Sequence, residues 1–400
     1  MITPAISHLS NGPHKGKQAS LPAMVRQPLR FMRPTLPAPD KWLPYLEESY
    51  RSQWFSNFGP VHVRFSEALT ERYGGDDRIA LPVSNCTAGL TATLLTLGLR
   101  GQVAMPSFTF SAPAHAVVGA GCTPLFCDID SDTWEMSGSS LDRLLTREKV
   151  VAVLHVRVFG LCRDLSPIEE VCRRHGVPLI VDAAAALGGA VASGPAIGHA
   201  GRFEVFSLHA TKTFGIGEGG VVFGHPEDIE HLRRVINFGQ DGSNISTLGL
   251  NGKLCEMHAA IGLAVLDDID LRIATRAAVA SFYKKELSGG PYGIRHASIP
   301  GQPAWSAYPI ELSSRDALDR LQRSVASQIE TRRYYFPSLH RSEAFAASVD
   351  LPVTNALDGR ILCLPVYSDM TREESQDVCR ALSALFEPLL QAPYPRGVEA

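Results

Sequence analysis

Between residues 79 and 225, short apolar segments alternate with amphipathic or alanine-rich segments, and this alternation constrains the fold more than any other feature of the chain. The apolar segments have the length of strands and read IALPVSN, QVAMPS, TPLFCDI, VVAVLHVRVFG, PLIVDAA, FEVFSLHA and GVVFG. Strands that are apolar on both sides are typical of a mostly parallel sheet with helices on both faces. We therefore predict a large α/β domain built from βαβ units.

Further elements flank this domain. A helix over PEDIEHLRRVINFG, with proline at its start, and a long helical stretch from about 253 to 285 follow the last predicted strand. The chain then combines two isolated strands, SAYPIEL and ILCLPVY, with two strongly helical segments, SRDALDRLQRSVASQIETRRYY and TREESQDVCRALSALFEPLLQ. We expect an N-terminal arm over residues 1–39, a large domain over 40–285 and a small α+β C-terminal domain over 286–400.

Charge and composition exclude several classes of function. The chain has 38 Lys and Arg against 41 Asp and Glu, and its net charge of -3 gives none of the basic field that nucleic-acid binding needs. No apolar run approaches the 18 or so residues of a membrane helix, so we expect no membrane span. The 8 cysteines form no C-x-x-C pair, and we expect reduced thiols in a cytoplasmic enzyme.

Two ionisable side chains stand at the carboxyl ends of predicted strands, where α/β sheets place their active sites. Lys212 lies in SLHATKTFGIGEGG directly after FEVF, and Asp182 ends the apolar run PLIVD. Taken alone, the lysine fits a solvated loop and the aspartate fits a helix cap. Together, a lysine that forms a Schiff base and an aspartate on a pyridinium nitrogen are the recurring arrangement of pyridoxal-phosphate enzymes.

A third motif suits a phosphate group. VSNCTAGL runs from a strand into an alanine- and leucine-rich helix, so the backbone amides at 86–88 and the Thr87 hydroxyl fall at a helix N-terminus. Such a terminus binds anions readily. The same motif, taken alone, is equally a plain N-cap. The order of motifs along the chain is more specific than any one of them: phosphate loop, aromatic segment, acid, lysine and glycine-rich loop.

In this order the motifs resemble the DegT/DnrJ/EryC1/StrS family of pyridoxal-phosphate aminotransferases, which act on nucleotide-linked keto sugars. SLHATKTFGIGEGG is close to the family's Ser-Phe-His-Ala-Thr-Lys followed by Gly-Glu-Gly-Gly, and WFSNFGPVHVRFSEAL, PSFTF, VDAAAALGG and LNGKLCEMHAAIGL also match. The resemblance covers about residues 40–385. It implies a fold-type I transferase, similar to aspartate aminotransferase, with a mixed, mostly parallel sheet in the large domain.

The resemblance also implies roles for individual residues. Lys212 is expected to bind the cofactor covalently, Asp182 to face its pyridinium nitrogen and Phe110 to stack on its ring. The phosphate ligands are expected to be Ser207, Thr87 with the Cys86 amide, and Asn237 of a partner subunit.

The substrates and assembly are implied in the same way. The amino donor is expected to be L-glutamate and the acceptor a nucleotide-linked 3- or 4-keto-6-deoxyhexose, with the 4-keto sugar favoured by the LNGKLCEMHAAIGL segment. The assembly is expected to be a homodimer with shared active sites.

One residue departs from the family pattern. Three residues after the aspartate, the family usually has Gln or His, which can hydrogen-bond the cofactor's phenolic oxygen, whereas this chain has Ala185. This departure is the feature that favours an alternative function, a pyridoxal-phosphate-binding regulatory or scaffold protein without turnover.

Two other motifs are not expected to carry function. Gly215, Gly217 and Gly220 spell the G-x-G-x-x-G of dinucleotide-binding folds, but a strand follows them where that fingerprint needs a helix. The histidines are too dispersed to make a metal site, and we predict no metal; those weighed were His155, His209 and His258.

Overall fold

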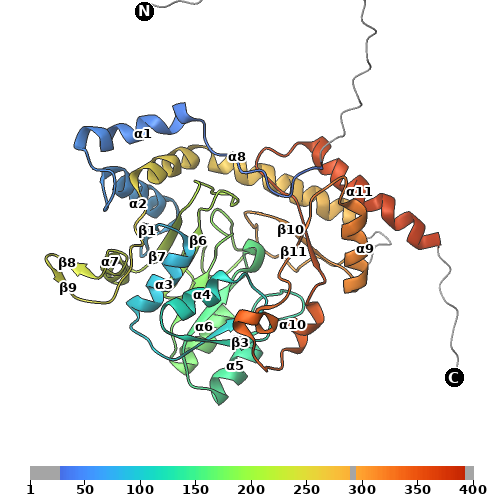
Figure 1. The fold of residues 1–400 in the computed structure, drawn as a ribbon, viewed down its shortest axis with the longest axis horizontal. Helices are drawn as coiled ribbons and strands as arrows, with labels where there is room; N and C mark the ends of the chain where they lie inside the picture. The colour runs from blue at the N-terminus through green and yellow to red at the C-terminus, as the bar shows by residue number, and fades with distance from the viewer. Residues whose placement is uncertain (1–27, 289–293, 392–400) are drawn as a thin grey trace, which may run out of the picture.

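The structure is a computed structural model that describes residues 28–288 and 294–391. Its centre is a seven-stranded sheet (Figure 1) made of β1 (Ile79–Val83), β2 (Gln102–Pro106), β3 (Thr123–Cys127), β4 (Val150–Val156), β5 (Leu179–Asp182), β6 (Phe203–Ser207) and β7 (Gly220–Gly224). The strand order is β1-β7-β6-β5-β4-β2-β3. Strands β2 to β6 pair in parallel, and β7 is antiparallel to both of its neighbours. The predicted mostly parallel sheet is confirmed.

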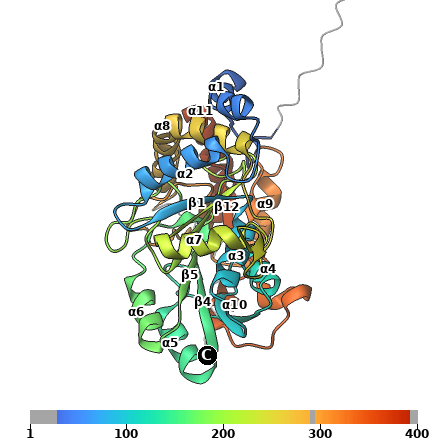
Figure 2. The ribbon, with the colours of Figure 1, turned by 90° about the vertical axis from the view of Figure 1, so that its left-hand side faces the viewer.

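Helices cover both faces of this sheet. One face packs against α3 (Cys86–Thr96), α4 (Ala112–Gly119) and α7 (Pro226–Val235). The other packs against α2 (Pro60–Tyr73), α5 (Gly138–Arg147), α6 (Ser166–His175) and the first half of α8 (Glu256–Leu287). Helix α1 (Pro39–Ser52) packs outside them, on α2 and α8. Figure 2 shows the sheet between the two layers, with α5 and α6 on its left and α3 and α4 on its right. No described helix is long and apolar enough to cross a membrane.

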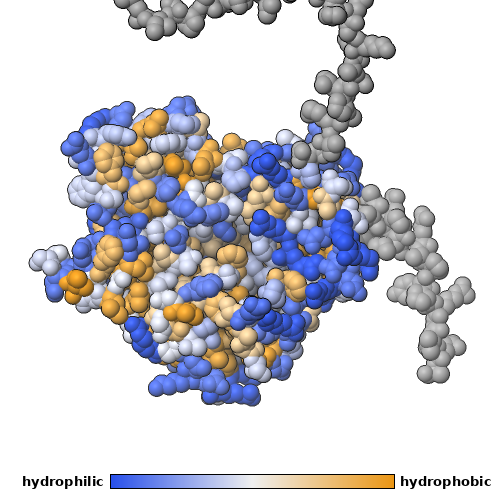
Figure 3. Space-filling view, in the orientation of Figure 1, coloured by the Kyte–Doolittle hydropathy of each residue, from blue (hydrophilic) through white to orange (hydrophobic). Residues whose placement is uncertain are grey.

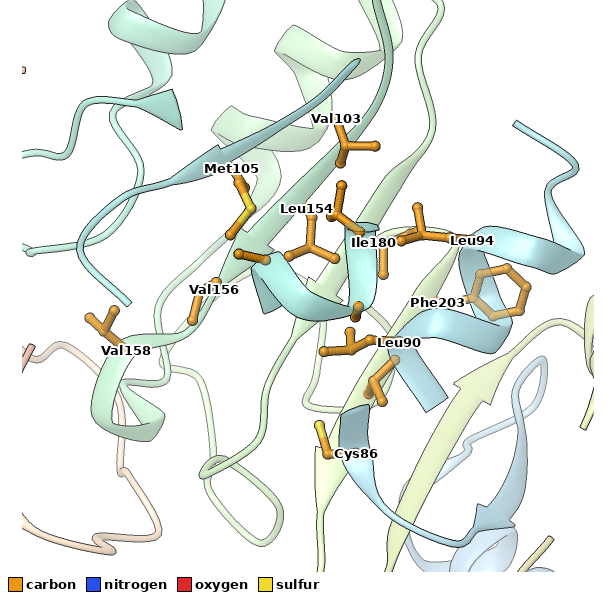
Figure 4. Close-up of a cluster of buried hydrophobic side chains, with 14 of the residues drawn as sticks. Cys86, Leu90, Leu94, Val103, Met105, Leu154, Val156, Val158, Ile180 and Phe203 are labelled. Carbon is orange, nitrogen blue, oxygen red and sulfur yellow. The ribbon is translucent and has the colours of Figure 1, made fainter. Parts of the chain in front are cut away.

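Helix α3 lies unusually close to the sheet because glycines face it. A Cβ on Gly89 of α3 would lie 3.0 Å from a methyl group of Val205, and a Cβ on Gly220 would lie 2.8 Å from the backbone nitrogen of Cys86. Leu90 of α3 therefore packs on the apolar strands, as Figure 4 shows. This packing fixes the N-terminus of α3 beside the carboxyl ends of the central strands.

The C-terminal part of the chain has its own small sheet, in the order β10-β12-β11. A third apolar core lies between this sheet, the second half of α8 and the last helices. The elements are β10 (Tyr308–Glu311), α9 (Arg315–Val325), β11 (Arg332–Arg333), α10 (Pro352–Leu357), β12 (Ile361–Leu364) and α11 (Arg372–Gln391), with 3-10 turns at Leu339–Arg341 and Glu343–Phe345. The division into a large and a small domain at residue 285, and the arm, remain predictions; residues 1–27 of the arm lie outside the described residues.

One helix is shorter than predicted. The segment SRDALDRLQRSVASQIETRRYY was expected to be helical throughout, but α9 ends at Val325. The chain then turns, buries Ile329, bridges it to Leu29 and continues as β11 against β12. Tertiary contacts outweigh the local helix propensity here. As a result, the aromatic residues after β11 reach the sheet of the other half of the chain.

Candidate active site

A cavity of about 600 Å³ lies at the carboxyl ends of β4, β5 and β6, next to the N-terminus of α3. One side, which we call the sheet wall, consists of Cys86, Thr87, Asp182, Ser207 and Lys212. A second group of lining residues, which we call the C-terminal wall, consists of Arg332, Tyr334 and Tyr335. Phe110, which is 59% exposed, also lines the cavity. The structure thus brings together six of the seven predicted site residues.

Asp182 is the most deeply placed acid of the cavity. It ends β5, is 4% exposed, and its Oδ1 accepts the backbone N–H of Ala184 at 3.0 Å. The Cys86 thiol lies 3.8 Å from the same oxygen. Burial raises the pKa of Asp182 to about 6, against the smaller opposing effects of the Ala184 amide and Lys212. A buried carboxylate is stabilised by a cationic hydrogen-bond donor, so this position suits a protonated ring nitrogen.

Lys212 lies on a tight loop that follows β6. Its backbone N–H donates to the carbonyl of His209 at 2.8 Å, and the loop closes through hydrogen bonds from Leu208 to Gly219 and from Ala210 to Gly217. Burial lowers the pKa of Lys212, while Cys86 and Asp182 act in the opposite direction. A lowered pKa increases the fraction of neutral amine, which is the form that attacks a carbonyl carbon.

The N-terminus of α3 offers hydrogen-bond donors at one end of the cavity. The first amides of a helix have no partner within it. The Asn85 side chain accepts the amide of Ala88 at 2.8 Å, which leaves the amides of Cys86 and Thr87 for an anion. The hydroxyl oxygen of Ser207 accepts the His209 amide at 3.3 Å, so its proton remains available to donate. The N-cap and anion-site interpretations of this motif are therefore compatible.

Asn237 does not line the cavity. It follows α7, forms an isolated bridge with Asn251, and its Nδ2 donates to Gln240 Oε1 at 3.2 Å. The neighbouring hairpin of β8 (Gln240–Asp241) and β9 (Asn244–Ile245) protrudes at the left of Figure 1. Apolar side chains are exposed around it, at the left of Figure 3: Phe238 (51%), Ile245 (71%) and Leu248 (68%). Asn237 therefore lies outside the cavity that this chain forms.

The residues of the cavity fit pyridoxal phosphate. The sheet wall holds an amine for covalent attachment, a buried acid that lacks a cationic hydrogen-bond donor, and unpaired amides at a helix terminus for a phosphate. Gly220 leaves the space that this helix terminus occupies, since a Cβ there would collide with Asn85 and Cys86. Lys212, Asp182, Thr87 and Ser207 therefore line a cavity whose chemistry suits such a cofactor.

Comparison with known proteins gives the family. The model of the DegT/DnrJ/EryC1/StrS aminotransferase family matches residues 40–383. The chain belongs to this family. It is accordingly a pyridoxal-phosphate-dependent aminotransferase of fold-type I.

Individual relatives match this aminotransferase over most of their length. Protein Rv3402c of Mycobacterium tuberculosis is 34% identical over 376 residues, covering 89% of this chain and 89% of the relative. The dTDP-4-amino-4,6-dideoxy-D-glucose transaminase of Shigella dysenteriae is 30% identical over 359 residues, covering 87% and 96%. The crystal structure of DesI in the presence of its TDP-sugar product has a TM-score of 0.83 and 31% identity, covering 93% and 97%.

Sequence reasoning missed the C-terminal wall of this aminotransferase. The sequence predicted no role for Arg332, Tyr334 or Tyr335, which line the cavity. Met32, from the segment before α1, also lines the cavity and was missed. These three C-terminal residues lie at the end of a segment that was predicted to be helical throughout, so the sequence does not show which part of the fold they meet.

Proposed function

We propose that this aminotransferase transfers the amino group of L-glutamate to a nucleotide-linked keto-deoxysugar, with the 4-keto-6-deoxyhexose favoured over the 3-keto sugar. The observation that carries the proposal is that the half-buried Lys212 and the buried Asp182 line one cavity. The named relatives support the acceptor: one is a dTDP-4-amino-4,6-dideoxy-D-glucose transaminase, and another is a GDP-perosamine synthase 29% identical to this chain.

The residues of the sheet wall divide the chemistry between them. When bound, pyridoxal phosphate supplies an electron sink for the bond that loses its proton. Asp182 keeps a proton on the pyridine nitrogen, which maintains that sink. Lys212 attaches the cofactor and then acts as the base that takes the α-proton of L-glutamate. In the second half of the reaction, the same amine returns a proton to the sugar carbon.

The remaining predicted ligands hold the cofactor in place. The amide of Cys86, the amide and hydroxyl of Thr87 and the hydroxyl of Ser207 bind the phosphate at the end of α3, where the helix dipole favours negative charge. Phe110 covers the ring from the open side of the cavity. Its 59% exposure is consistent with a side chain that closes over a flat ligand.

The C-terminal wall is proposed to bind the sugar nucleotide. Arg332 lies 5.4 Å from the centre of the Phe31 ring, and no carboxylate among the described residues pairs with it. An unpaired guanidinium suits a diphosphate. Tyr334 and Tyr335 lie on the same wall and present aromatic surface to the sugar and cofactor.

We also propose a cytoplasmic homodimer with shared active sites. Asn237 lies beside the exposed apolar hairpin of β8 and β9, and a second copy that covers this surface would bring the asparagine to its neighbour's phosphate. The cytoplasmic location is supported by the cysteines, all of which are free thiols.

Incubation of the purified enzyme with L-glutamate and a panel of nucleotide-linked 3-keto and 4-keto sugars tests the proposal. Mass spectrometry of the products is expected to show an amino sugar from a 4-keto acceptor and 2-oxoglutarate from the donor. Turnover restricted to 3-keto acceptors would overturn the preferred position. Turnover of keto acids alone would overturn the sugar assignment.

A further inference from the structure

Ala185 leaves the phenolic oxygen of the cofactor without the hydrogen bond that the residue at this position usually donates in the family. The residue lines the cavity three positions after Asp182, and its methyl group cannot donate a hydrogen bond. The phenolic oxygen of pyridoxal phosphate carries negative charge, and a charged oxygen in a buried cavity is destabilised unless it accepts a hydrogen bond. Another donor on the same side of the cavity must therefore be sought.

The contacts of Ala185 lead directly to one side chain. Gly160, in the turn Val158–Gly160, lies so close that a Cβ on it would be 2.3 Å from the Ala185 carbonyl oxygen. The preceding residue, Phe159, stacks on Tyr335 with ring centres 5.2 Å apart and an interplanar angle of 13°. All three of Ala185, Phe159 and Tyr335 line the cavity. Tyr335 and Ala185 therefore line the same part of the cavity.

A neighbouring cationic donor, Arg157, also lines the cavity, but partners on the other face of the sheet hold its guanidinium. Its guanidinium donates to Glu204 Oε1 at 2.8 Å and to the carbonyl of Arg163 at 2.7 Å. Glu204 is next to Val205, which pairs with Asp182, so successive side chains of β6 place Glu204 on the face opposite to Asp182.

The other hydroxyl groups of the sheet wall lie elsewhere. Thr87 and Ser207 belong to the phosphate end of the cavity, beside the N-terminus of α3. The Asn85 side chain is engaged in capping that helix. Tyr335 is the donor that packed residues connect to Ala185.

We propose that the hydroxyl of Tyr335 donates a hydrogen bond to the phenolic oxygen of the bound cofactor, in place of a side chain at position 185. The inference rests on the proposed placement of the cofactor between Lys212 and Asp182 and is independent of the sugar. Burial raises the pKa of Tyr335 well above its usual range, with a contribution from the charge of Asp182. The hydroxyl therefore keeps its proton at neutral pH.

Two phenylalanines pack against the ring of Tyr335 and hold it in place. Phe108 packs edge-on against Tyr335 with ring centres 5.3 Å apart, and Phe159 covers the ring face. Both phenylalanines are buried. Replacing the tyrosine by phenylalanine removes the hydroxyl and keeps this packing, so the substitution isolates the hydrogen bond.

The test follows the visible absorption of the cofactor bound to Lys212 as pH is varied, without amino donor or sugar. Without the donor, the phenolic oxygen becomes more basic, and Tyr335→Phe is expected to raise the midpoint of the spectral transition by about one pH unit or more. The dissociation constant of pyridoxal phosphate, measured by dialysis and fluorescence, is expected to rise about tenfold or more.

Tyr334→Phe is the matched control, since it removes a hydroxyl from the adjacent ring of the same wall. We expect its midpoint to equal that of the wild type. An unchanged midpoint in Tyr335→Phe, or an equal shift in both variants, would overturn the proposal. Far-UV circular dichroism checks that each variant is folded. Because no sugar is present, a wrong sugar assignment leaves these results unchanged, and borohydride reduction with peptide mapping tests separately whether the cofactor is on Lys212.

Discussion

The sheet wall and the C-terminal wall of the cavity are built in different ways. Asp182 and Ser207 end strands of the central sheet and are fixed by pairing with adjacent strands. Lys212 follows β6 closely and is fixed by backbone hydrogen bonds within its loop. The C-terminal wall begins in a two-residue strand, β11, continues just after it, and is positioned by contacts between distant parts of the chain. The first wall is suited to chemistry that tolerates little displacement, and the second to recognition of a variable substrate.

One buried network attaches the C-terminal wall to the rest of the cavity. Ser107, fully buried, lies 2.7 Å from His340 Nδ1, and His340 Nε2 lies 3.0 Å from Asn355 Oδ1. The arrangement resembles a nucleophile with its base, but Ser107 is not accessible to substrate. The network joins the segment after β2, which leads to Phe110, to the segment after Tyr335.

The largest effect is expected at the centre of the sheet wall. Lys212→Ala removes both the attachment point and the proton carrier, so transamination is expected to fall by about a thousandfold or more. Borohydride reduction followed by peptide mapping should find no modified peptide in the variant and find the cofactor on Lys212 in the wild type. Recovery of the cofactor on another lysine in the wild type would show that the site is misplaced.

Asp182→Asn comes next. The amide cannot keep the pyridine nitrogen protonated, and a loss of about a hundredfold or more in kcat is expected. Near-normal rates would mean that Asp182 is only structural.

In the cofactor-free protein, the same substitution is expected to increase stability. Because the folded pKa of Asp182 is about 6, against its ordinary value of 3.8, the folded state favours the protonated acid, and its stability falls as pH rises from about 4 to about 6. Above that range, Asp182→Asn is expected to increase the free energy of unfolding by up to about 3 kcal/mol. Urea denaturation at pH 5 and pH 8 checks this; an equal gain at both values would contradict it.

Substitution of Asn237 tests whether a second copy of the chain contributes to the cavity. Loss of a hydrogen bond to phosphate costs about 1.5 to 3 kcal/mol, so Asn237→Ala should weaken cofactor binding by about 10- to 150-fold. Mixing it with Lys212→Ala at limiting cofactor should restore activity in hybrid dimers.

The bridge partner Asn251 is the comparison variant for this experiment. If activity returned on mixing Lys212→Ala with Asn251→Ala but not with Asn237→Ala, the shared site would still hold. The phosphate ligand would then be Asn251 instead of Asn237. A fully active monomer in sedimentation, or no rescue in hybrids shown to have formed, would contradict the shared site.

The smallest effect is expected on the C-terminal wall. Arg332→Gln should raise the KM for the nucleotide sugar by about tenfold, since one charge-assisted hydrogen bond to a diphosphate is lost. The absorption of the bound cofactor and the KM for L-glutamate should not change. A fall in kcat with unchanged KM would place Arg332 with the sheet wall instead.

The difference between the sheet wall and the C-terminal wall also explains which residues could be predicted from the sequence. The strands of the central sheet were predictable from their apolar runs, and Lys212 and Asp182 from their position at the ends of those runs. Tyr335 was not predictable, because its place depends on the end of α9 at Val325 and on the bridge between Leu29 and Ile329. Local propensity favoured a longer helix, and contacts across about 300 residues of chain prevented it.

Helix α8 fixes how the C-terminal core is rotated relative to the core of the central sheet. Its 32 residues span about 48 Å, with Leu263 and Ile269 in the core of the central sheet and Tyr283 in the C-terminal core. Insertion of a single residue in its middle would rotate everything beyond by about 100° and advance it by about 1.5 Å. Helix α8 can therefore change in length only in steps that restore its rotation.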